Sequence, residues 1–277
     1  MEQHTKTAAI VLAAGSGKRM GAGQNKMFLQ LAGKTVLERT VTAFQQCDMV
    51  DGIVVVAKAD ELEQVKAMVP QAMYHKVIAY TAGGKERQDS VLCGLQILDA
   101  SYHKVLIHDG ARPFVTTALI GDLLSNLVPG TGTIAGVPAK DTIKRVNAES
   151  IVQETLVRSE LWNIQTPQCF YTSEILSCYA HALEDGYTGT DDASLAEKYG
   201  LSVRVVPAYY ENIKLTTPED LAFGDEMLQI KSDENSGVAW FAIDEAVERS
   251  TEPWFQERIY KKLNQKLKKW VEENGFK

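Results

Sequence analysis

The chain has 277 residues, 45% hydrophobic and 23% charged, with a net charge of −7. This composition is ordinary for a globular protein with a sizeable core, and the negative charge argues against general binding to nucleic acid. The sequence shows no signal-peptide pattern, no apolar stretch long enough to span a membrane, and four cysteines without a CxxC pair. We therefore expect a cytoplasmic protein with reduced cysteines and no integral membrane association.

A continuous apolar run at 8–14 predicts a buried strand that ends in a turn rich in glycine and cations. The turn spans residues 15–20 (GSGKRM), and Lys26 follows seven residues after Arg19. Glycine allows backbone amides to approach a polyphosphate closely, and the cations supply counter-charge. A dinucleotide fingerprint is matched only in part, because Met20 stands in place of the third glycine. The stretch therefore indicates a site for nucleotide phosphates.

Predicted strands and helices alternate along the chain. Strands are expected at 52–57, 77–79, 105–108, 133–137 and 202–207, and helices at 35–46, 60–69, 91–98, 116–127 and 173–185, near 190 and from 217. This alternation predicts an α/β fold with a mostly parallel twisted sheet and helices on both faces. Ligands of such sheets bind at the carboxyl ends of the strands, where residues 15–26, 83–91 and 109–113 should meet.

Two segments depart from the alternation. Residues 141–146 and 151–156 alternate polar and apolar around a turn, which predicts a β-hairpin within a projecting arm at about 139–163. Residues 231–237 are typical of a linker, and apolar residues recur every four positions from Phe255 to Val271, which predicts an amphipathic helix. We therefore expect one domain at 1–230 and a helical C-terminal extension at 231–277. Packing of this extension on the domain or on a partner subunit is favoured over a helix that lies on a membrane surface.

Asp109 follows a predicted strand, close to Arg112, and a carboxylate there can hold Mg²⁺ against phosphate oxygens. The same aspartate could instead only cap the turn. Residues 85–87 (KER) could be a charged helix start, but the double glycine before them and Ser90 after them favour a turn that faces a nucleotide. No Ser/His/Asp or metal-ligand cluster stands out in the sequence.

Seven motifs together resemble a known family. They are LAAGSGKRM (12–20), GGKERQDSV (83–91), DGARP (109–113), DTIKR (141–145), QTPQ (165–168), TDDAS (190–194) and NIKLTTPEDL (212–221). Over residues 7–229 the chain resembles the 2-C-methyl-D-erythritol 4-phosphate cytidylyltransferases of the non-mevalonate isoprenoid pathway. One departure adjoins Lys26: many members have Pro before the corresponding lysine and Gln after it, whereas this chain has Asn25 and Met27.

The resemblance implies a Rossmann-like nucleotidyltransferase fold and a homodimer in which the arm hairpin embraces the partner. It implies that CTP and methylerythritol phosphate are joined with the help of Mg²⁺, and that pyrophosphate is released. Catalysis is assigned to Arg19 and Lys26, and the metal to Asp109. Acceptor binding is assigned to Thr142, Arg158, Thr166, Thr190 and Lys214, with Arg158 and Thr190 extending across the dimer. The CTP site is expected at Ala13, Ala14, Gly15, Ser16, Gly17, Lys18, Gly84, Ser90, Gly110 and Arg112.

Three alternatives stay open at this point. A ribitol-5-phosphate cytidylyltransferase would keep the chemistry, although such enzymes tend to carry a second glycine where this chain has alanine in residues 12–15. An NAD-dependent oxidoreductase is disfavoured by Met20 and by the absence of an acidic residue after the strand at 53–57. A non-catalytic nucleotide-binding regulator would bind CTP without releasing pyrophosphate.

Overall fold

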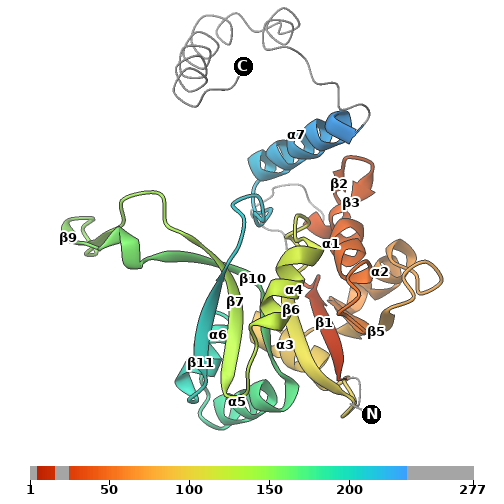
Figure 1. Ribbon diagram of the computed structural model, residues 1–277, viewed down its shortest axis with the longest axis horizontal. Coiled ribbons are helices and arrows are strands. Elements are labelled where there is room, and N and C mark those ends of the chain that lie inside the picture. Colours follow the sequence, from red (N-terminus) through yellow and green to blue (C-terminus); the bar gives the residue numbers. More distant parts are fainter. Residues whose placement is uncertain (1–4, 16–24, 236–277) are drawn as a thin grey trace, which may run out of the picture. The chain divides into compact units, whose positions relative to one another are not determined.

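The computed structural model describes residues 5–15 and 25–235, with side chains described as far as residue 228. Its centre is a seven-stranded sheet of order β11-β7-β10-β6-β1-β4-β5 (Figure 1). The strands are β1 (Lys6–Leu12), β4 (Gly52–Ala57), β5 (Val77–Ala82), β6 (Tyr102–Asp109), β7 (Thr131–Pro138), β10 (Trp162–Tyr171) and β11 (Ser202–Pro207). Only β10 runs antiparallel to its neighbours in this sheet, which confirms the predicted, mostly parallel α/β architecture.

Strand β1 organises the sheet. Every residue of β1 after Lys6 is buried, as expected for a strand with helices over both faces. Its register places Leu12 beside Asp109 of β6 on one side and beside Val56 of β4 on the other. The three strands therefore end at the same edge of the sheet. The chain leaves β1 toward β4 and returns on the other side to β6, so the gap between β1 and β6 is a topological switch point.

Helices cover both faces of the sheet (Figure 1). They are α1 (Val36–Gln45), α2 (Leu62–Met68), α3 (Arg87–Leu95), α4 (Thr117–Ser125), α5 (Thr172–Glu184) and α6 (Asp192–Lys198). The remaining elements are the helix α7 (Pro218–Asn235), which follows the last strand, and the short 3-10 helices η2 (Lys26–Phe28), η3 (Ala59–Glu61) and η4 (Arg158–Glu160). Ile10 of β1 packs in one core cluster with residues of α3, α5 and α6. Alternate β1 residues point to the opposite face, where α1 contacts β1, β4 and α4.

The sequence did not predict strand β10. In the sequence, residues 166–168 indicate only the point at which the main domain resumes, without an assigned element. Pro167 lies in the middle of the strand and cannot donate a ladder hydrogen bond, which hides the strand in the sequence. The structure accommodates the proline with a register shift between Ile164 and Gln168 in the pairing with β7. The expected linker was also wrong for residues 231–235, which continue α7. That segment contains no glycine or proline to end a helix.

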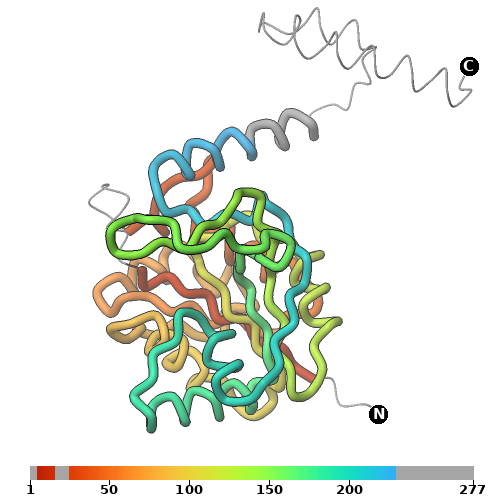
Figure 2. The backbone as a smooth tube through the Cα atoms, turned by 90° about the vertical axis from the view of Figure 1, so that its left-hand side faces the viewer, coloured from red at the N-terminus to blue at the C-terminus, as the bar shows by residue number. Residues whose placement is uncertain are grey.

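The predicted hairpin is confirmed: β8 (Lys144–Val146) pairs antiparallel with β9 (Val152–Thr155). It projects away from the central sheet in Figure 1, and Figure 2 views it from its outer side. All residues of both strands are exposed, including the apolar Val146 and Val152. A second small hairpin joins β2 (Gln30–Leu31) to β3 (Lys34–Thr35).

The chain divides into two compact units, Met1–Met227 and Leu228–Lys277. The expected boundary at 230 stays a prediction, and the expected amphipathic helix around Phe255–Val271 lies outside the described residues. Among helices of the described ranges, none has the length and apolar character needed to cross a membrane.

Candidate active site

A cavity of about 820 Å³ opens where β1, β4, β5 and β6 end, within the size range typical of ligand sites. Its lining is drawn from the segments that follow these strands and from the loop before α7. The lining residues are Leu12, Ala14, Gly15, Lys26, Met27, Lys58, Gly84, Lys85, Glu86, Arg87, Ser90, Asp109, Ala111, Lys214 and Thr216. The strand-end segments that the sequence predicted to converge therefore share one cavity.

Lys26 and Asp109 both line this cavity, although 83 positions separate them in the sequence. Lys26 opens η2, and its side chain is largely buried, with only 8% of the residue exposed. Its ammonium donates a hydrogen bond of 2.8 Å to the backbone carbonyl of Leu215. That carbonyl belongs to the same loop as Lys214, so the two lysines are held by one segment. Arg19, Ser16, Gly17 and Lys18 lie outside the described residues.

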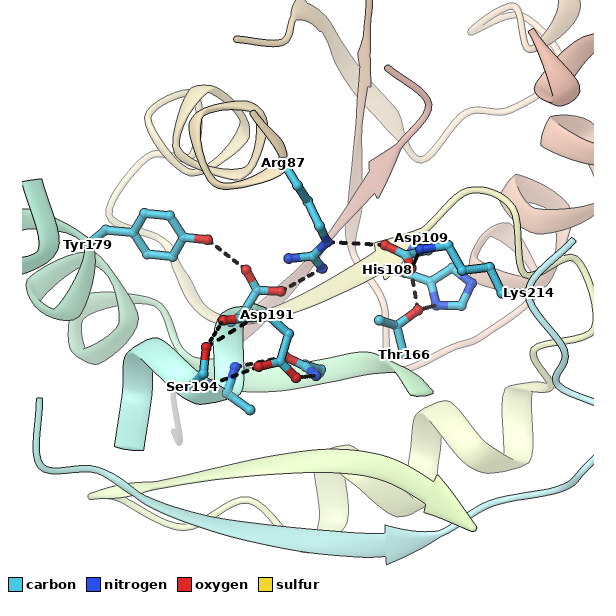
Figure 3. A network of polar contacts seen from close by, with 11 residues as sticks. Arg87, His108, Asp109, Thr166, Tyr179, Asp191, Ser194 and Lys214 are labelled. Atoms are coloured by element: carbon cyan, nitrogen blue, oxygen red, sulfur yellow. Dashed lines mark hydrogen bonds and ion pairs between the residues drawn. The ribbon is translucent and has the colours of Figure 1, made fainter. Parts of the chain in front are cut away.

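Asp109 is held between two cations (Figure 3). Its Oδ2 accepts a 2.7 Å hydrogen bond from Nζ of Lys214, and its Oδ1 lies 3.3 Å from Nε of Arg87. Burial by itself would raise the pKa of this carboxyl, but the charges of Arg87 and Lys214 outweigh burial and hold the pKa well below its ordinary value. Asp109 therefore stays ionised at neutral pH.

Arg87 bridges Asp109 to a second carboxylate behind the cavity. Its Nη2 donates to Oδ2 of Asp192 at 2.8 Å, and Tyr179 donates its hydroxyl to Oδ1 of the same carboxylate at 2.6 Å (Figure 3). Asp192 has no exposed surface. Burial would lower the pKa of Arg87, but Asp192 and Asp109 raise it, which keeps the guanidinium charged. The sequence placed Arg87 in a turn expected to face a nucleotide, gave Asp192 no role, and carried no signal for Tyr179.

His108 and Thr166 anchor the end of β6. Nε2 of His108 lies 3.1 Å from the carbonyl of Arg112, an acceptor only, so this nitrogen carries the proton and donates. Nδ1 then accepts the Thr166 hydroxyl at 3.1 Å, and Thr166 Oγ1 in turn accepts the Asp109 N–H at 3.0 Å. Burial lowers the pKa of His108 to about 4, so the ring is neutral. The Thr166 hydroxyl thus holds the backbone of Asp109 rather than lining the cavity.

Three of the sequence motifs form one hydrogen-bonded framework. Gln168 donates to Oδ2 of Asp191 at 2.7 Å and accepts the N–H of Ala193 at 2.9 Å, which joins β10 to the start of α6. Asn212 donates to Oε1 of Gln165 at 2.9 Å and to the carbonyl of Thr166 at 3.0 Å. These bonds fix the loop that presents Lys214.

The structure separates the expected site residues into two groups. Those that line the cavity are Ala14, Gly15, Lys26, Gly84, Ser90, Asp109 and Lys214. Outside the lining are Ala13, Gly110, Arg112, Thr142, Arg158, Thr166 and Thr190. Of the second group, Gly110 packs so tightly that a Cβ there would lie 2.7 Å from the Leu12 carbonyl. Thr142, Arg158 and Thr190 are exposed, and Arg158 donates to the carbonyl of Lys140 at 3.0 Å.

Lys58 was missed as a site candidate, and Lys85, also in the lining, was expected only as part of the turn that faces a nucleotide. Lys58 directly follows β4, so the strand-end rule that selected Asp109 could have selected it too. With Lys26, Arg87 and Lys214 they give the cavity five cationic side chains against the two carboxylates Asp109 and Glu86. That surplus suits a polyanionic ligand.

The donor set in the cavity fits a magnesium ion that takes most of its ligands from phosphate and water. In the described part of the chain no cluster of three or more His, Cys, Asp or Glu side chains could hold a metal alone. Mg²⁺ at phosphate-transfer sites is commonly bound by one or two carboxylates together with substrate phosphates. Asp109, ionised and facing the cavity, is the residue that would supply the carboxylate.

Sequence comparisons with known proteins point to a family of nucleotidyltransferases. A family model described as 2-C-methyl-D-erythritol 4-phosphate cytidylyltransferase matches residues 7–230. The chain is 46% identical over 220 residues to the protein of that name from Geobacillus thermodenitrificans, covering 79% of this chain and 96% of the relative. It is 45% identical over 224 residues to the one from Halalkalibacterium halodurans, covering 81% and 97%.

Solved structures show the same likeness in three dimensions. The 4-diphosphocytidyl-2C-methyl-D-erythritol synthase from Anaerococcus prevotii superposes with a TM-score of 0.73 at 33% identity, covering 82% of this chain and 100% of that one. The 2-C-methyl-D-erythritol 4-phosphate cytidylyltransferase from Thermus thermophilus gives a TM-score of 0.66 at 28% identity, covering 81% and 99%.

Proposed function

Because this chain belongs to the 2-C-methyl-D-erythritol 4-phosphate cytidylyltransferase family, we propose that it joins CTP and 2-C-methyl-D-erythritol 4-phosphate to give 4-diphosphocytidyl-2-C-methyl-D-erythritol and pyrophosphate. The observation that carries the proposal is the cation-rich cavity at the switch point between β1 and β6, where Arg87 and Lys214 pair with Asp109 and Lys26 lines the same cavity. Family membership also favours this acceptor over ribitol phosphate, and cytidylyl transfer over hydride transfer.

The reaction is an in-line displacement at the α-phosphorus of CTP. A phosphate oxygen of the acceptor forms a new P–O bond, while the bond from the α-phosphorus to the bridging oxygen breaks and its electron pair leaves with pyrophosphate. The attacking oxygen is already anionic, so no general base is required. The barrier lies in bringing two anions together and in the charge that builds up on phosphorus and leaving group.

Lys26 and Lys214 hold fixed positive charges in a partly buried cavity. There they stabilise the negative charge on phosphorus and pyrophosphate more strongly than they would in water. Both side chains have partners that hold them in place, the Leu215 carbonyl for Lys26 and Asp109 for Lys214. Arg19 is proposed to add a further cation. A magnesium ion held by Asp109 would neutralise phosphate charge when bound.

The acceptor site is proposed to be completed by a second subunit. Thr142 and Arg158 lie in the arm and Thr190 lies before α6, all of them exposed and outside the cavity of a single chain. The arm carries exposed apolar residues, among them Ile151 and Val157, that a partner subunit would cover. We therefore propose a homodimer in which each arm embraces the other subunit.

Pyrophosphate release by the purified chain tests the proposed function. The chain is incubated with CTP and Mg²⁺ and with either methylerythritol phosphate or ribitol 5-phosphate, and NADH binding is measured separately. We expect release with methylerythritol phosphate at a rate well above that with ribitol 5-phosphate, and no NADH binding. Faster release with ribitol 5-phosphate would favour the related acceptor, and no release with either would leave a non-catalytic binding protein.

A further inference from the structure

Asn25 stands directly before Lys26, at the position where many members of the resembled family have proline. Its backbone has φ −64° and ψ 128°, and a φ near −65° is the value that a proline ring imposes. The Asn25 N–H donates no hydrogen bond to the residues that the structure describes, so a proline at this position would break none of the described bonds. Asn25 thus has the φ angle of a proline without the ring that would fix it.

The Asn25 side chain supplies what the ring would supply. Its Oδ1 accepts the N–H of Met27 at 3.1 Å and so caps the short helix that Lys26 opens. Both hydrogens of its amide group are also used. Nδ2 donates to the carbonyl of Ala13 at 3.0 Å and to Oε2 of Glu61 at 2.6 Å.

These partners lie in two different segments, one after β1 and one after β4. Ala13 directly follows β1 in the expected nucleotide loop, and Glu61 is paired at 2.9 Å with Lys58, which lines the cavity after β4. Asn25 itself is only 4% exposed, so its hydrogen bonds are protected from competing water. One side chain therefore joins the turn that carries Lys26 to the ends of two strands.

We propose that Asn25 is the positioning residue for Lys26, and that its three side-chain hydrogen bonds hold the turn at the φ that proline would fix covalently. This inference rests on the proposed function, because it assigns Lys26 to catalysis. It goes beyond that function by assigning a role to a residue at which this chain departs from the family motif. A displaced catalytic group loses rate steeply, and an error of about 1 Å can cost on the order of 10²-fold.

The experiment compares Asn25→Ala and Asn25→Pro with wild type in steady-state kinetics, with Asn126→Ala as the matched control. Asn126 is exposed at the end of α4 and makes a local bond to the Asp122 carbonyl. We expect Asn25→Ala to lower kcat by about 10²-fold with little change in the KM for CTP, and Asn25→Pro to recover at least about tenfold of that loss. Asn126→Ala should behave as wild type.

A double-variant cycle separates positioning from a general structural role. If Asn25 acts through Lys26, adding Asn25→Ala to Lys26→Ala should cause no further fall in kcat. Circular dichroism and thermal melting check that each variant is folded. Should Asn25→Ala fail to fold, Asn25→Ser replaces it, because serine keeps a cap oxygen and lacks the amide donors.

Three results would each overturn the assignment: an unchanged kcat in the alanine (or serine) variant, a proline variant no more active than that variant, or a further fall in the double variant. Failure of the proposed function is a separate result, because the wild-type chain would then form no product from CTP and methylerythritol phosphate.

Discussion

The guanidinium of Arg87 donates to the buried carboxylate of Asp192 at 2.8 Å, across 105 positions of sequence. The same guanidinium also pairs with Asp109 in the cavity, so two carboxylates share the positive charge of Arg87. We predict that Asp192→Asn lowers the free energy of unfolding by about 3 kcal/mol, because it leaves Arg87 short of a buried partner. Urea unfolding of Asp192→Asn and of Arg87→Gln/Asp192→Asn checks this, since the double variant should recover part of the loss. A single variant as stable as wild type would contradict it.

Lys26→Ala is expected to fold normally and to lose about 10²–10³-fold in kcat, because the loss removes a fixed cation beside the developing charge. Lys66→Ala is the control, since Lys66 is exposed and paired with Glu63 on α2. Steady-state or stopped-flow kinetics give kcat for both variants and for wild type. Near-normal kcat in Lys26→Ala would remove this lysine from the mechanism.

Arg158→Ala is expected to raise the KM for methylerythritol phosphate by about tenfold or more and to leave the KM for CTP close to wild type, because it removes the charged hydrogen-bond donor that we propose for the acceptor phosphate. Arg145→Ala serves as control, being an exposed arm residue paired with Glu154. The measurement is KM for each substrate with the other saturating. Equal increases for both substrates would contradict the placement of Arg158 at the acceptor.

Ile151→Asp is expected to shift the proposed dimer to monomer, because it puts a carboxylate among the exposed apolar residues of the arm. Ile151 is 63% exposed in the single chain. Val128→Asp is the control, since Val128 is similarly exposed after α4, away from the arm. Sedimentation velocity reports the oligomeric state. A wild-type monomer, or a dimer that Ile151→Asp does not weaken, would argue against the arm as the interface.

His108 is expected to make stability depend on pH below neutrality. Burial lowers the pKa of His108 to about 4, whereas the unfolded chain has an ordinary histidine pKa of about 6.5. The unfolded state therefore binds more protons between these values, so stability is fully present above about pH 6.5 and is lost as pH falls toward 4. Between pH 7.5 and 5.0 this costs about 2 kcal/mol.

The check is urea unfolding of wild type and His108→Asn at both pH values. The loss of stability between pH 7.5 and 5.0 should be smaller in the variant by about 2 kcal/mol, because its side chain does not titrate. Equal losses in the two proteins would show that His108 is not the group responsible.

The sequence predicted those strands and helices whose residue pattern is local and uninterrupted. The strands at 52–57 and 202–207 have the expected bounds, because each is a short run of β-favouring residues between clear turn signals. Strand β10 escaped prediction because Pro167 interrupts its pattern, and only pairing with β6 and β7 makes it a strand.

The site divides in the same way. Asp109, Gly84 and Lys26 could be placed in one cavity because strand ends in a parallel sheet converge. The pairing of Arg87 with Asp192, and of Asp192 with Tyr179, could not be predicted. Asp192 lies on α6 and Tyr179 on α5, and only tertiary packing brings these side chains to α3. The role of Asn25 likewise depends on Glu61, whose approach no spacing in the sequence predicts.

The central claim is that the acceptor's own phosphate oxygen attacks the α-phosphorus of CTP in this cavity. Methylerythritol phosphate labelled with ¹⁸O in its phosphate group tests this most directly, with the products separated and analysed by mass spectrometry. The account predicts that all of the label remains in 4-diphosphocytidyl-2-C-methyl-D-erythritol and that pyrophosphate carries none. Label in pyrophosphate, or release of CMP in place of the diphosphate product, would contradict it.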